Sequence, residues 1–96
     1  MSDVDETKNP AEPAKVLIYT TQFCGYSFSA KAMLDEKNVE YFEVDVEDPK
    51  KRAMMVQRTK GRHTVPQIFI DGVLIGGYDE MAALDRDGKL DQMLRI

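Results

Sequence analysis

The stretch KVLIYTTQFCGYSFSAKAMLDEKNVEYFEVDV, residues 15–46, decides the fold. It begins at residues 15–21 with a short apolar run, rich in β-forming side chains, that predicts a buried strand. Residues 40–46 alternate apolar and acidic side chains, with Phe42 and Val46 on the same side, and predict a second strand. The stretch therefore starts and ends in a strand.

The segment between the two strands predicts a helix over residues 25–37. One of its faces is formed by Ala30, Met33, Leu34 and Lys37, which recur at three- and four-residue spacing. A helical crossover makes the two strands parallel, and such crossovers are right-handed. We therefore expect a β-α-β unit.

Three further elements follow this unit. Residues 49–59 predict a helix that Asp48 caps, with Ala53, Val56 and Met55 as candidates for its inward face. Residues 65–70 and 73–75 predict two strands, because the intervening Asp71-Gly72 is a strong signal for a two-residue hairpin.

Two short helices complete the chain. One runs to Leu84 and is capped by Asp79 or its neighbour, and the last covers residues 89–95. The order β-α-β, α, β-hairpin, α predicts an α/β fold: a mixed four-stranded sheet with helices on both faces.

Composition and charge limit the classes of function that the chain can have. Ninety-six residues make one domain, and residues 1–14 form a polar leader that we expect to be flexible, which leaves residues 15–96 as the folded domain. The net charge is −4, without a basic stripe for nucleic acid, and no apolar run is long enough for a membrane span. A single cysteine gives no sign of an oxidising compartment, so a cytoplasmic location is expected.

Cys24 is the candidate nucleophile. It directly follows the first predicted strand, and Gly25 opens the next helix. Free backbone N–H groups and the helix dipole favour a thiolate at a helix N-terminus. The alternative is a buried structural cysteine.

Two other segments carry possible chemistry. A cis bond at Val65-Pro66 would leave the backbone of Val65 free to pair with an extended peptide, whereas the alternative is an ordinary proline at a strand start. In residues 76–80 (GGYDE), the glycines allow close approach of a ligand, the helix start suits a carboxylate, and Asp79 suits an amino group. The alternative is a glycine turn before a capped helix.

Taken together, three motifs resemble the glutaredoxin family over the chain from Lys15 onward. They are CGYS at residues 24–27 followed by Ala30-Lys31, TVPQIFI at residues 64–70 and GGYDE at residues 76–80. The resemblance implies a thioredoxin-like fold and a glutathione-dependent thiol–disulfide oxidoreductase. Its substrates would be glutathionylated or disulfide-containing proteins, and its co-substrate glutathione.

The resemblance also implies a role for each matching residue. Cys24 would take glutathione onto its sulfur, and no metal site is implied for that reaction. The glutathione-binding residues would be Tyr26 lining the groove, Arg62 and Thr64 at the glycine carboxylate, Val65 and Pro66 along the backbone, and Gly77, Tyr78 and Asp79 at the γ-glutamyl end.

The motif departs from the two-cysteine members of the family at three positions. Gly25 replaces a proline, Ser27 stands in the position of the resolving cysteine, and Thr21 replaces a frequent lysine. Arg62 and the compact segment before Cys24 differ from the C-G-F-S branch, whose members bind iron–sulfur clusters. Two origins of Ser27 stay open: an experimental Cys-to-Ser replacement and a natural one-thiol protein.

The sequence leaves other functions open as well. A glutathione-bridged dimer would place one [2Fe–2S] cluster between two copies of Cys24 and two glutathione thiolates, although a monomer is expected. A redox-inactive binding module would require an unreactive Cys24. Phe28 is either an exposed substrate contact or a side chain packed on the neighbouring loop.

Overall fold

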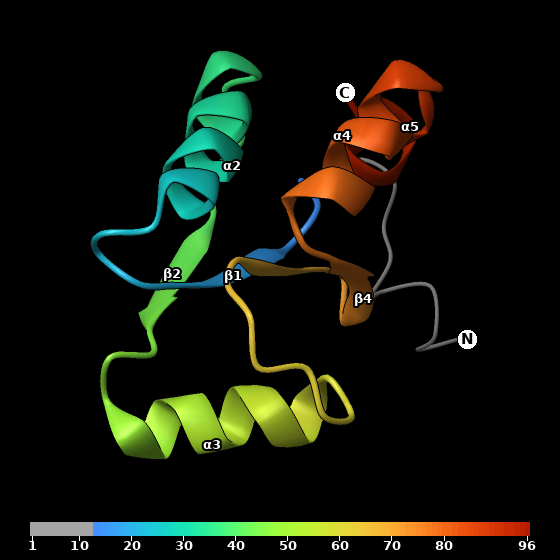
Figure 1. Cartoon of the computed structure of the whole chain (residues 1–96). Coiled ribbons are helices and arrows are strands. Elements are labelled where there is room, and N and C mark those ends of the chain that lie inside the picture. Colours follow the sequence, from blue (N-terminus) through green and yellow to red (C-terminus); the bar gives the residue numbers. More distant parts are fainter. Residues whose placement is uncertain (1–12) are drawn as a thin grey trace, which may run out of the picture.

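The computed structural model describes residues 13–96 and shows one mixed sheet with helices on both faces (Figure 1). The strand order is β2-β1-β3-β4. The elements, in chain order, are β1 (Val16–Thr20), α2 (Gly25–Glu36), β2 (Phe42–Asp45), α3 (Pro49–Arg58), β3 (Gln67–Ile70), β4 (Val73–Gly76), α4 (Tyr78–Arg86) and α5 (Lys89–Leu94).

The strand pairing confirms the predicted topology. β1 runs parallel to β2 and antiparallel to β3, and β3 pairs antiparallel with β4. Asp71 and Gly72 join β3 to β4 with φ values of 52° and 82°. Positive φ at both central residues is what the commonest two-residue hairpin turn requires, and an Asp-Gly pair adopts it readily.

The core is divided between the two faces of the sheet. On one face, α2, α4 and α5 cover a cluster that includes Ile18, Leu34 and Met81, each fully buried. On the other, α3 covers a smaller cluster around Tyr19 and Met55. Burying each such aliphatic side chain contributes about 1.5–3 kcal/mol. The sheet is therefore packed on both faces.

Two apolar side chains are more exposed than the sequence pattern suggests. In α3, Met55 is fully buried and Ala53 is exposed, because the helix presents the Met55 side to the sheet. In β2, Phe42 is 78% exposed. β2 is an edge strand with only β1 beside it, and Phe42 stands at its first position, whereas Val46 follows its last position and packs with Met55.

The structure corrects the predicted start of α4 and the predicted start of the folded domain. The N-cap of α4 is Gly77 and not Asp79, which lies in the first turn of the helix. Ala14 is 8% exposed and packs into the core, while the rest of the predicted flexible leader lies almost wholly outside the described residues. None of the helices in residues 13–96 has the length and apolar character needed to span a membrane.

Candidate active site

Cys24 is the N-cap residue of α2, as the sequence predicts. β1 ends at Thr20, and the short loop after it brings Cys24 to the end of the sheet, where its side chain is half-buried. The Sγ atom lies 3.6 Å from the carbonyl oxygen of Val65, to which the thiol donates. The Val65-Pro66 bond is cis, which confirms the prediction for that segment.

The first turn of α2 favours the ionised form of this thiol. Burial raises the pKa of Cys24, but hydrogen bonds from the backbone N–H and the hydroxyl of Ser27 and from the backbone N–H of Tyr26 lower it. The net pKa lies below the ordinary value of a cysteine. A larger fraction of the sulfur is therefore thiolate, the nucleophilic form.

Ser27 lies beneath Cys24 and is only 1% exposed. The Ser27 hydroxyl has no hydrogen-bonding partner among the described residues. Ionisation of Cys24 supplies one, because the hydroxyl then donates to the thiolate. The serine is thus placed to stabilise the reactive state of its neighbour.

Beside Cys24 lies a groove of about 310 Å³. Three segments far apart in the sequence line it: the first turn of α2, the loop before β3, and the junction of β4 with α4. The lining residues are Tyr26, Arg62, Thr64, Val65, Pro66, Gly77, Tyr78, Asp79 and Glu80. All eight residues assigned to glutathione from the sequence are among them, so the fold brings the predicted set together.

Several aromatic side chains near Cys24 in the sequence are exposed, and one of them lines the groove together with Tyr78. The rings of Tyr26 and Tyr78 approach each other, with their centroids 6.2 Å apart. Tyr26, Phe23 and Phe28 are 64%, 87% and 71% exposed. Phe28 is therefore exposed and not packed on the neighbouring loop.

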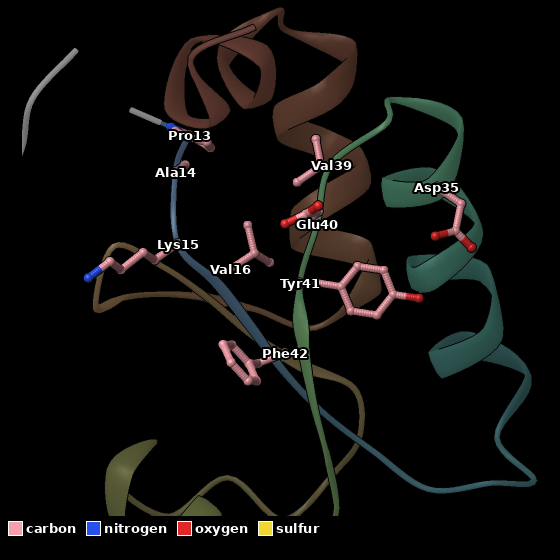
Figure 2. Close-up of a pocket in the computed structure, with 9 residues that line it drawn as sticks. All are labelled: Pro13, Ala14, Lys15, Val16, Asp35, Val39, Glu40, Tyr41 and Phe42. Carbon is pink, nitrogen blue, oxygen red and sulfur yellow. The ribbon is translucent and has the colours of Figure 1, made fainter. Parts of the chain in front are cut away.

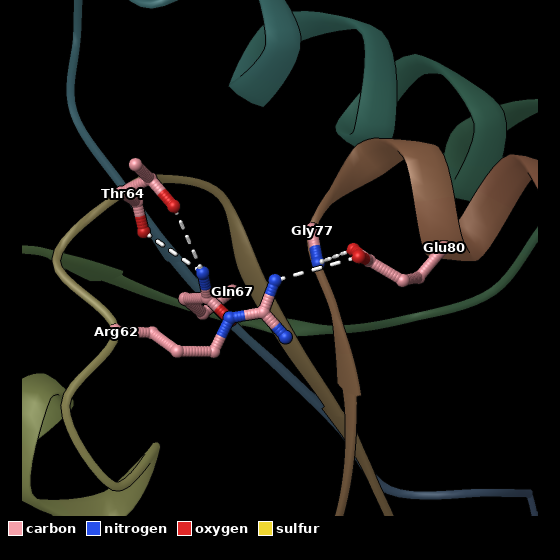
Figure 3. A network of polar contacts seen from close by, with 5 residues as sticks. All are labelled: Arg62, Thr64, Gln67, Gly77 and Glu80. Atoms are coloured by element: carbon pink, nitrogen blue, oxygen red, sulfur yellow. Dashed lines mark hydrogen bonds and ion pairs between the residues drawn. The ribbon is translucent and has the colours of Figure 1, made fainter.

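Polar contacts join residues that line the groove (Figure 3). The Gly77 backbone N–H donates to Glu80 Oε1 at 2.6 Å, and Arg62 Nη2 lies 3.5 Å from Glu80 Oε2. The bond from Gly77 lowers the pKa of Glu80, opposed by burial and aided by Arg62, so Glu80 is a carboxylate at neutral pH. Sequence reasoning gave Glu80 no role, although its place three residues after the N-cap is a known capping signal.

Gln67 is a second site residue that sequence reasoning missed. It is fully buried in β3, and its Nε2 donates to the carbonyl oxygen of Thr64 at 3.0 Å and to the Thr64 hydroxyl at 3.3 Å (Figure 3). These bonds hold the loop that carries Val65. A polar side chain in an otherwise apolar strand was the available signal.

A larger hollow of about 780 Å³ lies elsewhere, between the start of β1 and the start of β2 (Figure 2). Val16, Val39, Tyr41 and Phe42 form much of its lining, together with Pro13, the first described residue. It contains no thiol, so the groove beside Cys24 is the candidate site. Within residues 13–96, no three side chains of the metal-binding types gather to hold an ion.

The fold and the site define a thioredoxin-like α/β domain with one thiol at a helix N-terminus. The chain belongs to the glutaredoxin family, whose family model matches residues 16–75. Glutaredoxin 3 of Escherichia coli K12 is 47% identical over 83 residues, which cover 85% of this chain and 99% of that protein. Membership implies a thiol oxidoreductase role.

Solved structures agree with this assignment. The solution structure of glutaredoxin from Brucella melitensis is 43% identical, with a TM-score of 0.78, over 91% of this chain and 95% of that one. The crystal structure of a buckwheat glutaredoxin–glutathione complex is 27% identical, with a TM-score of 0.77, over 95% of this chain and 84% of that one.

Proposed function

We propose that this protein is a glutathione-dependent thiol–disulfide oxidoreductase that reduces glutathionylated proteins through Cys24 alone. The observation that carries the proposal is the position of the Cys24 sulfur, 3.6 Å from the Val65 carbonyl oxygen and next to a groove that all eight expected residues line. The buckwheat relative, solved as a glutathione complex, supports the choice of ligand.

The reaction has two thiol–disulfide exchanges. The Cys24 thiolate attacks the glutathione sulfur of a mixed disulfide, so that a bond forms between Cys24 and glutathione while the bond to the substrate protein breaks. The substrate leaves as a thiolate and takes up a proton. A second glutathione thiolate then attacks the bound glutathione sulfur, which releases oxidised glutathione and regenerates the Cys24 thiolate.

The groove residues bind and orient the glutathionyl group. The pairing of β3 with β1 begins at Gln67, so Val65 lies outside it. The backbone of Val65 is therefore available to pair with an extended peptide. Arg62 receives the glycine carboxylate, beside Thr64. At the other end, beside Gly77, the first-turn backbone N–H groups of Tyr78 and Asp79 receive the γ-glutamyl carboxylate, and the Asp79 side chain receives the ammonium group.

Turnover of a glutathionylated protein tests the proposal. The wild-type chain should release the glutathione in the presence of reduced glutathione, and Cys24→Ser should abolish the activity. Ser29→Ala, a change on the same helix but outside the groove lining, should keep it. Equal activity of wild type and Cys24→Ser would contradict the proposal.

A cluster-binding function is the second candidate. A side chain at Gly25 would meet no heavy atom within 4 Å, so the residue beside Cys24 leaves open space for a partner. One chain supplies only one thiolate, so a [2Fe–2S] cluster needs two chains and two glutathione molecules. Visible absorbance after anaerobic purification with glutathione would favour this function, and a colourless protein would exclude it.

We propose that the working form is a monomer in the cytoplasm, where a reducing environment keeps a lone thiol reduced. Light scattering of the reduced protein should give the mass of one chain, and cell fractionation should recover it with cytoplasmic markers. A dimer that contains no cluster, or recovery of the protein from an oxidising compartment, would contradict the proposal of a cytoplasmic monomer.

A further inference from the structure

Glu80 occupies the groove in a way that the proposed reaction does not use. Its Oε1 accepts the Gly77 backbone N–H at 2.6 Å, and its Oε2 lies 3.5 Å from Arg62 Nη2 (Figure 3). Glu80 therefore contacts Arg62, the group that would receive the glycine carboxylate of a glutathionyl group, and also the start of α4. Arg62 is the one cation among the groove-lining residues that the structure describes.

The chain makes room for this arrangement at Gly76. A Cβ atom there would lie 2.7 Å from Glu80 Oε1 and 3.1 Å from Arg62 Nη1, and the φ of 115° is one that side chains rarely adopt. The two charged side chains thus meet directly over the end of β4. Only a glycine lets them approach so closely.

The Arg62–Glu80 contact is also easy to break. The two side chains are 39% and 49% exposed, and ion pairs of that kind contribute little net stability. Glu80 can therefore turn into solvent when another carboxylate competes for the guanidinium group.

We propose that Glu80 is a built-in competitor for the glycine carboxylate of glutathione: it holds Arg62 until a glutathionyl group displaces it, and so weakens glutathione binding beside Cys24. This inference rests on the proposed function. Glu80 lowers the affinity of the groove without taking part in sulfur chemistry.

The test is the glutathionylation equilibrium of the full chain. Cys24 thiolate attacks oxidised glutathione, a Cys24–glutathione disulfide forms, and one glutathione thiolate leaves. At fixed ratios of reduced and oxidised glutathione, intact mass spectrometry measures the fraction of adduct. Glu80→Gln should raise the equilibrium constant about two- to fivefold, the range expected for one exposed ion pair.

Glutamine at position 80 can still accept the Gly77 N–H, so the start of α4 is retained, which thermal unfolding can verify. Glu47→Gln is the matched control, because it makes the same charge change on an exposed side chain outside the groove lining. It should leave the equilibrium unchanged. With glutathione esterified at its glycine carboxylate, the gain from Glu80→Gln should disappear.

Three results would overturn the inference: no change in Glu80→Gln, a smaller adduct fraction, or the same gain with the ester. Each leaves the proposed function standing, because the wild type still forms the adduct. A wild type that forms no adduct at any ratio would overturn the proposed function and this inference together.

Discussion

At Cys24, three hydrogen-bond donors from the first turn of α2 converge on one sulfur. Two are backbone N–H groups, of Ser27 and Tyr26, and one is the Ser27 hydroxyl. Their combined effect exceeds the opposing effect of burial, so the pKa of Cys24 falls below its ordinary value. The backbone donors come with any helix start, but the hydroxyl depends on the residue at position 27.

Ser27→Ala should therefore raise the pKa of Cys24. Removing the hydroxyl takes away one of the donors that lower this pKa, and a hydrogen bond to the charged form favours that form. The rate of iodoacetamide alkylation against pH gives the inflection directly. Ser29→Ala on the same helix should not move it. An unchanged or lower inflection in Ser27→Ala would contradict this role of the hydroxyl.

Position 27 also decides whether the thiol has an internal partner. Residue i+3 of a helix lies near residue i, so a thiol there can attack a disulfide on Cys24. Ser27→Cys should form an intramolecular disulfide under mild oxidation, seen by mass spectrometry as the loss of two hydrogens and of the stable glutathione adduct. Ser29→Cys, five residues from Cys24, should keep the adduct. If Ser27→Cys still accumulates the adduct, position 27 is not the place of a resolving cysteine.

Among the elements, α3 and the loop after it position Arg62. Thr59, at the C-cap of α3, is 3% exposed. Its hydroxyl donates to the Met55 carbonyl oxygen at 2.8 Å and accepts the Arg62 backbone N–H at 3.1 Å. One side chain thus closes the helix and starts the loop that lines the groove.

Thr59→Val keeps the shape of this side chain and removes both bonds. The free energy of unfolding should fall by about 1–3 kcal/mol, because the Arg62 N–H and the Met55 carbonyl group lose a partner in a buried place. Urea denaturation measures the change. Thr21→Val, at a half-buried position outside α3, should cost less than half as much. An equal fall in the free energy of unfolding of both variants would contradict a stabilising role of the Thr59 hydrogen bonds.

The order and pairing of the elements could be predicted because their signals are local. Asp71-Gly72 marks the hairpin, and a helix between two strands makes β1 and β2 parallel. The inward face of α3 could not be predicted as well. Helical spacing alone does not distinguish the Ala53 side from the Met55 side, and the sheet decides between them.

At the scale of the whole molecule, the groove forms because the helices packed on the two faces of the sheet hold three segments, far apart in the sequence, at one end of the sheet. The lining residues could be predicted because their motifs resemble a family, and the fold brings them together there. Glu80 was missed because its partner Arg62 lies 18 residues away, and only the folded chain shows the contact. Gln67 was missed because its bonds to Thr64 serve the loop and not the ligand.

The central claim is that Cys24 takes the glutathionyl group and not the protein to which that group is attached. The groove beside Cys24 supports it, because all eight residues expected to bind glutathione line it. The direct measurement mixes the reduced chain with an equimolar glutathionylated protein, without free glutathione, and follows both intact masses. The account predicts that one glutathione moves to Cys24 and the partner is released as a free thiol. A disulfide between the two proteins, or no transfer, would contradict it.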